Sequence, residues 1–161
     1  MNYFAFAALM LIAGAATAGD EQSCAAAGGS FRSGTVVKAP RFAHGQFRKG
    51  IELSHTHVAL LADQDGRTYD VAIDNVYANG HNPHKKGVPP ALAAIAVRDR
   101  IEVCGQLYER GVGIHWVHTN CGAKPTPERP DGWVRQLARD GSAGPNLEGD
   151  KAFCKLFKSG R

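Results

Sequence analysis

Apolar and polar positions alternate along two adjacent segments, which predicts a β-hairpin. Residues 51–62 are rich in β-branched and apolar side chains, and residues 67–75 alternate between the two faces of a strand. The intervening residues 63–66, Asp-Gln-Asp-Gly, are typical of a turn. The second segment is expected to place Tyr69, Val71 and Ile73 in the core.

Three further strands are predicted at residues 33–38, 100–108 and 113–119. Residues 41–50 contain glycine and arginine and are expected to form a loop. Two prolines precede residues 91–97, whose alanine, leucine and isoleucine content favours a short helix. Three strands, a helix and two strands follow one another in the order of the OB-fold.

We therefore predict a mainly β fold, a small five-stranded OB-like barrel with one short helix between strands three and four. An SH3-like barrel is the alternative, but such barrels usually lack that helix. The predicted organisation is a signal peptide (1–18), a loose leader (19–32), the β-barrel domain (33–138) and a disulfide-tethered C-terminal tail (139–161) with a short helix over residues 150–158.

The first residues have the features of an export signal. Residues 3–16 are uncharged and too short to span a membrane comfortably, and they lead into Ala16-Thr17-Ala18, a small-x-small cleavage pattern. We expect cleavage after Ala18, a periplasmic or secreted location, and no stable membrane insertion after cleavage. An uncleaved N-terminal anchor is the alternative.

The composition shows a mildly basic chain, and its cysteines indicate an oxidising compartment. The formal net charge of +4 attracts anionic ligands but is weak evidence for nucleic acid. An even number of cysteines in an exported chain predicts two disulfides, each stabilising the fold by roughly 2–4 kcal/mol. The four are Cys24, Cys104, Cys121 and Cys154, and every pairing among them remains open. A zinc site is the alternative, although no Cys-x-x-Cys occurs.

The histidines supply the candidate metal site. His55 and His57 are two residues apart on a predicted strand and point to the same side, where they could hold a divalent metal. The alternative is a pair that makes ordinary hydrogen bonds at the barrel edge. His115 and His118 are three apart, so a regular strand sends them to opposite faces unless a bulge intervenes. No cofactor is otherwise indicated, because P-loop and dinucleotide motifs are missing.

Carboxylates occupy the polar face of the third predicted strand. Asp70 and Asp74 lie opposite its apolar side, and Asn75 follows at the strand end. Paired with His57 across the hairpin, Asp74 could act as a general base or metal ligand, whereas an ordinary polar strand end is the alternative. A catalytic site on this basis would consist of His57, Asp74, His115 and His118.

Both tryptophans lie between residues 113 and 134. Exposed, Trp116 and Trp133 would stack on bases or sugars; buried, they would fill the core, which the alternation with Ile114 favours for Trp116. A Pro-Asp-Gly turn before Trp133 could fold its loop back over the barrel. The candidate binding residues are His57, Asp74, Asn75, Lys85, Lys86, His115, Trp116, His118, Asp131 and Trp133.

Two motifs resemble a family of small exported bacterial proteins catalogued as a domain of unknown function. Residues 113–118, Gly-Ile-His-Trp-Val-His, are similar to its Gly-x-Ile-His-Trp-Thr-His stretch, and residues 130–134, Pro-Asp-Gly-Trp-Val, to its His-Pro-Asp-Gly-Trp-Ile stretch. Arg129 stands where the family has the histidine. The resemblance implies a compact periplasmic β-barrel and no established activity.

The leading hypothesis is an exported binding or accessory module, whose ligand is an anionic polymer or an exported protein. It follows from the tryptophans, the Lys85-Lys86 loop and the incomplete catalytic set. One alternative is a metal-assisted phosphodiesterase or nuclease-like hydrolase. Another is an inhibitor or partner of an exported enzyme.

Overall fold

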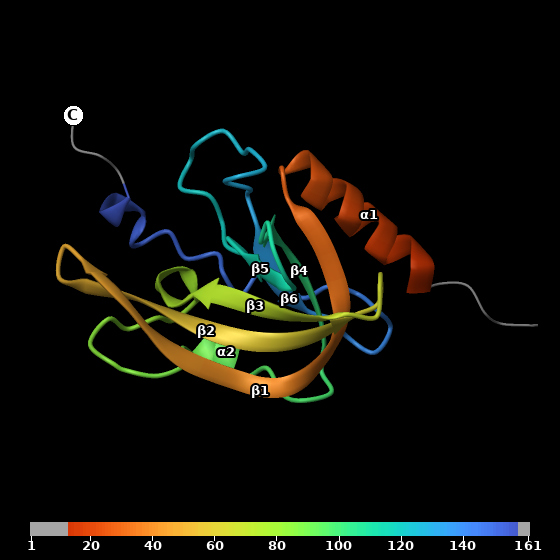
Figure 1. The fold of residues 1–161 in the computed structure, drawn as a ribbon, viewed down its shortest axis with the longest axis horizontal. Helices are drawn as coiled ribbons and strands as arrows, with labels where there is room; N and C mark the ends of the chain where they lie inside the picture. Colours follow the sequence, from red (N-terminus) through yellow and green to blue (C-terminus); the bar gives the residue numbers. More distant parts are fainter. Residues whose placement is uncertain (1–12, 158–161) are drawn as a thin grey trace, which may run out of the picture.

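A computed structural model describes residues 13–157, which form a mainly β fold with one six-stranded sheet and two α-helices (Figure 1). The strands are β1 (Ser30–Arg48), β2 (Ile51–Ala62), β3 (Thr68–Asp74), β4 (Arg100–Leu107), β5 (Gly113–His115) and β6 (Trp133–Gln136). The helices are α1 (Ala13–Ala26) and α2 (Pro90–Ala93), accompanied by two 3-10 turns, η1 (Asn75–Tyr77) and η2 (Cys154–Leu156). The predicted β class is confirmed.

The strand pairings close on themselves. β1 pairs with both β2 and β4, and the order β1-β2-β3-β5-β4 returns to β1. β5 pairs with the end of β4 and β6 with its beginning, while β3 and β5 run parallel. The enclosed core includes the predicted inward face of β3, together with Val58, Leu60, Ile101, Val103 and Ile114.

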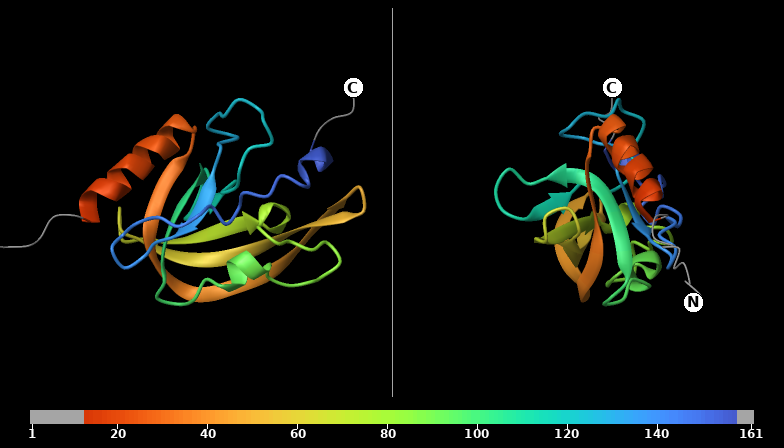
Figure 2. Two further views of the ribbon diagram at one scale, coloured as in Figure 1. Left: turned by 180° about the vertical axis from the view of Figure 1, so that it is seen from behind. Right: turned by 90° about the vertical axis from the view of Figure 1, so that its right-hand side faces the viewer.

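β1 is longer than predicted, because residues 41–48 pair with β2 instead of forming a loop. The hairpin turns at Lys49 and Gly50, which both have positive φ, as type I′ turns require. The register shifts around Pro40 and Gly45, so bulges accommodate the residues that indicated a loop. The hairpin tip extends toward the C-terminal segment (Figures 1 and 2), where Lys49 Nζ lies 3.4 Å from the carbonyl oxygen of Lys155.

The loose leader expected before β1 is helical as far as Ala26, which corrects that prediction. Two anchors hold α1 on the sheet: the disulfide from the fully buried Cys24 to Cys104, and an ion pair of 3.1 Å between Asp20 and Arg135. Arg135 also lies 3.2 Å from the buried Glu102. Small and polar residues give no local signal for a helix that tertiary contacts stabilise.

The remaining predicted elements are shorter in the structure. The helix expected at residues 91–97 is the four-residue α2, and the C-terminal helix expected at residues 150–158 is limited to η2. β6 was not predicted, since a four-residue strand carries too little alternation to be recognised.

Both disulfides are resolved, as Cys24–Cys104 and Cys121–Cys154. The pairs use all four cysteines and therefore leave no thiolate for the alternative zinc site. The predicted signal peptide lies mostly outside the described residues, which begin at Ala13. No helix within the described range is long and apolar enough to cross a membrane.

Candidate functional site

The outer face of β2 and β3 carries four ionisable side chains, because alternate positions of both strands face the core. Val71 and Ile73 are fully buried, so Asp70 and Asp74 point outward. His55 lies directly across from Asp74 in the antiparallel register. His57 follows two residues later on the same face.

Asp74 is held between two histidines. Its Oδ1 lies 2.7 Å from Nε2 of His55, and its Oδ2 lies 3.3 Å from Nε2 of His118. Burial alone would raise the pKa of Asp74, but hydrogen bonds from His118 and His55 outweigh burial and hold that pKa below its usual range. The hydrogen bond to Asp74 in turn raises the pKa of His55. The arrangement favours a carboxylate beside an imidazolium.

His118 is a buried part of this cluster. Its ring stacks on Tyr77 with centroids 3.8 Å apart, and its Nδ1 lies 2.9 Å from the carbonyl oxygen of Thr119. A carbonyl can only accept, so Nδ1 carries a hydrogen. Its Nε2 faces Oδ2 of Asp74. Both ring nitrogens are therefore engaged, and His118 has no nitrogen left for a ligand.

A turn of the backbone at Trp116 separates His115 at the end of β5 from His118, which faces Asp74. Trp116 has φ of 54°, which ends β5 at His115 and interrupts the alternation expected through residue 119. Val117 therefore enters the core in place of Trp116, whose half-buried indole lies 5.0 Å from the His118 ring. The turn at Trp116 therefore replaces the regular alternation on which the prediction of opposite faces depended.

His115 is the third imidazole near Asp74. Burial lowers its pKa, the charge of Asp74 opposes that shift, and the charges of His118 and His55 add to it. Its ring contacts Tyr108 with centroids 4.7 Å apart. We call His55, Asp74, His115 and His118 the histidine cluster.

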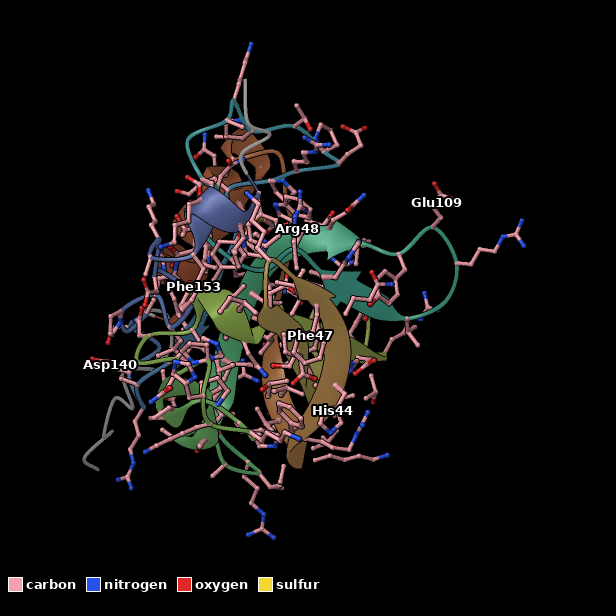
Figure 3. The ribbon with its side chains drawn as sticks, turned by 90° about the vertical axis from the view of Figure 1, so that its left-hand side faces the viewer. His44, Phe47, Arg48, Glu109, Asp140 and Phe153 are labelled. Atoms are coloured by element: carbon pink, nitrogen blue, oxygen red, sulfur yellow. A yellow bond between two sulfur atoms is a disulfide. The ribbon has the colours of Figure 1, made fainter. Side chains whose placement is uncertain are left out.

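A pocket of about 580 Å³ opens beside the histidine cluster. Asp74, His118 and Trp116 line it, and Arg48 at the end of β1 and Arg129 in the loop between β5 and β6 bring positive charge. Cys154 and Phe157 of the C-terminal segment also line the pocket, as does Cys121 of the loop after β5. Figure 3 shows Arg48 near the tip of the β1–β2 hairpin, on the side of the segment that carries Phe153. The Arg48 guanidinium lies 5.3 Å from the centre of the Phe157 ring.

His57 belongs to a second hollow on the same face. Its Nδ1 lies 2.9 Å from Oδ2 of Asp70, so its carboxylate partner is Asp70 and not the predicted Asp74. This hollow of about 360 Å³ is also lined by Lys38 and Arg41. One cationic hollow thus lies on the outer β2–β3 face, and the other adjoins that face at Asp74.

The predicted metal pair does not converge. The rings of His55 and His57 are 6.5 Å apart, and each faces a different aspartate. Within residues 13–157, no group of three or more histidine, cysteine or acidic side chains is arranged to hold a metal ion.

Several predicted binding residues lie elsewhere. Trp133 is buried beside the Cys24–Cys104 disulfide, beneath the guanidinium of Arg135, and is no stacking platform. Asn75 is fully buried and hydrogen-bonds Thr56 and Ser54, so it fixes β2 to η1. The exposed Lys85 and Lys86 line neither hollow.

The Pro-Asp-Gly turn supports the cluster from behind. Asp131 Oδ1 accepts hydrogen bonds from the Asn120 backbone at 2.6 Å and from the Thr119 hydroxyl at 3.3 Å. Gly132 N donates to the carbonyl oxygen of His118 at 2.9 Å. The motif therefore positions His118, and Asp131 does not itself line the pocket.

Glu148 is a buried acid that the sequence did not reveal. It is fully buried, and neither carboxyl oxygen has a hydrogen-bond partner in the described part of the chain. Burial, followed by the nearby charge of Asp74, raises its pKa well above the usual value. Its position in a Gly/Ser/Pro-rich segment gave no indication of burial, because that depends on packing against η1 and the loop after β5.

Replacing Glu148 with glutamine is expected to stabilise the protein increasingly as pH rises. The raised folded pKa means that the folded state binds more protons than the unfolded state. The contribution of Glu148 to stability is therefore fully present below the unfolded pKa and is lost as pH rises through the folded pKa, at about 1.4 kcal/mol per unit. Urea unfolding at pH 5 and pH 7.5 measures the difference in unfolding free energy between the variant and the unaltered protein. A difference that does not increase with pH contradicts the prediction.

A scan of protein-family models finds no match to the chain, and searches of curated proteins and of solved structures also find none.

Proposed function

We propose that the protein is an exported binding module with an OB-like barrel, which binds an anionic polymer across the outer face of β2 and β3. The observation that carries the proposal is the pocket lined by an indole, a histidine and two arginines, one at the end of β1 and one in the loop between β5 and β6. Guanidinium groups suit phosphate recognition, and an indole provides a stacking surface for bases.

The strand arrangement supports the OB-like part of this proposal. The circuit β1-β2-β3-β5-β4 with a helix between β3 and β4 has the strand order expected of that fold. OB-folds bind oligonucleotides and oligosaccharides on the face of strands 2 and 3, between the β1–β2 and β4–β5 loops. In this chain the hollow beside His57 lies on that face, the larger pocket adjoins it at Asp74, and the exposed Tyr108 and Val112 flank the β4–β5 connection.

Export is proposed on two grounds. Disulfides persist in oxidising compartments, and the chain has two that connect residues 80 and 33 positions apart. The N-terminal pattern adds a signal peptide ending at Ala18. Membership of the exported family with the Gly-x-Ile-His-Trp and Pro-Asp-Gly-Trp motifs is part of the same proposal.

Replacing Arg48 and Arg129 together with alanine is expected to weaken binding of a fluorescein-labelled 20-mer of deoxythymidine about 10-fold or more at low ionic strength. Each lost phosphate contact should also reduce the slope of log affinity against log salt by about 0.7. Fluorescence anisotropy over a salt series measures both quantities.

The matched control is the double replacement of Lys85 and Lys86 with alanine. It also removes two positive charges, but from an exposed loop that lines neither hollow. A loss below about 2-fold is expected, since only the long-range attraction changes. Equal losses in the two double variants, or no binding by the unaltered protein, would overturn the proposed function.

A further inference from the structure

His55 has the geometry of an oriented acid–base group. Its Nε2 is engaged by Asp74 at 2.7 Å, and its side chain is 36% exposed. The carboxylate fixes the ring orientation and stabilises the imidazolium, which leaves Nδ1 for a substrate. His118 cannot take this role, because Asp74 and Thr119 engage both of its nitrogens.

His115 is a second imidazole on the same face, and its surroundings favour the neutral form instead of the charged one. It is half-buried against Tyr108. It follows Ile114, which pairs with Val71 of β3 and is buried in the core, so the His115 side chain lies on the outer face beside β3. Burial and the neighbouring cations favour its neutral form, whereas Asp74 favours the charged form of His55. When the environment shifts the pKa values of two neighbouring groups in opposite directions, one can act as an acid and the other as a base at the same pH.

We propose that the histidine cluster cleaves single-stranded RNA, with the 2′-hydroxyl of the substrate as nucleophile, His115 as general base and His55 as general acid. The inference rests on the proposed function, because it requires the polymer to lie across the outer β2–β3 face. Arg48 and Arg129 line the pocket beside the cluster, where they would hold phosphates of the same strand.

The reaction balances without a further reactant. His115 accepts the proton of the 2′-hydroxyl as the bond from that oxygen to phosphorus forms. The bond from phosphorus to the 5′-oxygen breaks, and that oxygen receives the proton from Nδ1 of His55. The products are a 2′,3′-cyclic phosphate and a 5′-hydroxyl end. The enzyme is left with a charged His115 and a neutral His55, which exchange protons with solvent. His118 acts as a positioning residue through Asp74.

The test uses a uridine 12-mer with a fluorophore and a quencher at its ends, and the deoxyuridine 12-mer of the same length. The full-length protein is expected to bind both and to cleave only the ribose form, with a cyclic phosphate detected by mass spectrometry. His55→Gln and His115→Gln should each reduce cleavage about 100-fold or more while leaving the affinity for the deoxy 12-mer within about 2-fold. His84→Gln, in an exposed loop, is the matched control and should retain cleavage.

The outcomes separate the two proposals. Binding of the deoxy 12-mer without cleavage of the ribose form overturns the catalytic inference and leaves the binding function standing. Cleavage that persists in His55→Gln, that extends to the deoxy 12-mer, or that a chelator abolishes also overturns the inference. Failure to bind either oligonucleotide overturns the binding function.

Discussion

The variant Gly132→Ala is expected to lose about 3 kcal/mol or more of unfolding free energy, which corresponds to a fall in melting temperature of about 10 °C. A Cβ at this position would overlap the carbonyl oxygen of Cys104, and it would lie 2.5 Å from the carbonyl oxygen of Trp116 and 3.1 Å from the His118 nitrogen. All three neighbours are backbone atoms, so no side-chain rotation relieves the clash. Thermal unfolding followed by circular dichroism measures the effect.

The same variant reports on the candidate site. Gly132 donates to the carbonyl oxygen of His118, so relief of the clash must move the segment that carries the buried imidazole. Any folded fraction of Gly132→Ala is therefore expected to bind the deoxythymidine 20-mer more weakly than the unaltered protein. Gly149→Ala is the control, because a Cβ there meets only ordinary contacts of 3.7 Å or more. A melting temperature of Gly132→Ala that matches the control would contradict the packing described for this turn.

The parts of the fold that follow from local alternation were predictable. The bounds of β2 agree with the predicted 51–62, and the inward face of β3 agrees with the predicted side chains. Alternation fixes which face of a strand is buried, since each residue turns the side chain by half a revolution. The parallel β3–β5 pairing is a long-range contact with no local signal.

The partner of Asp74 was harder to predict. A shift of two residues keeps every side chain on its face but changes which side chains lie opposite each other. The length of the turn between β2 and β3 decides this register, and it places His55, not His57, across from Asp74. The sequence therefore identified the face and the residue types of the site, but not the pairs.

Backbone conformation at single residues accounts for other differences. The φ of 54° at Trp116 redirects Val117 into the core and His118 toward Asp74. Positive φ is uncommon for a residue other than glycine, and tertiary contacts have to impose it. The burial of Glu148 and the docking of α1 likewise depend on contacts between segments far apart in the chain.

Replacing Cys24 and Cys104 together with alanine is expected to reduce the unfolding free energy by about 4–5 kcal/mol, because the bond closes a loop with a sequence separation of 80. Both residues are fully buried beside Phe31 and Trp133, and the disulfide anchors α1. The variant should nevertheless bind the deoxythymidine 20-mer normally below its melting temperature, since neither cysteine lines the pocket.

The double variant of Cys121 and Cys154 is the informative comparison. The sequence separation of 33 between these cysteines predicts a similar loss of about 4 kcal/mol of unfolding free energy. Stability alone therefore does not distinguish the two bonds. Both of these cysteines line the pocket, and their bond ties η2 to the segment that follows His118. Loss of the bond releases that pocket wall, and binding measured below the melting temperature should fall by about 10-fold. Equal affinities in the two double variants would show that the ligand does not enter this pocket, whereas weakened binding in the Cys121/Cys154 variant alone supports the pocket as its site.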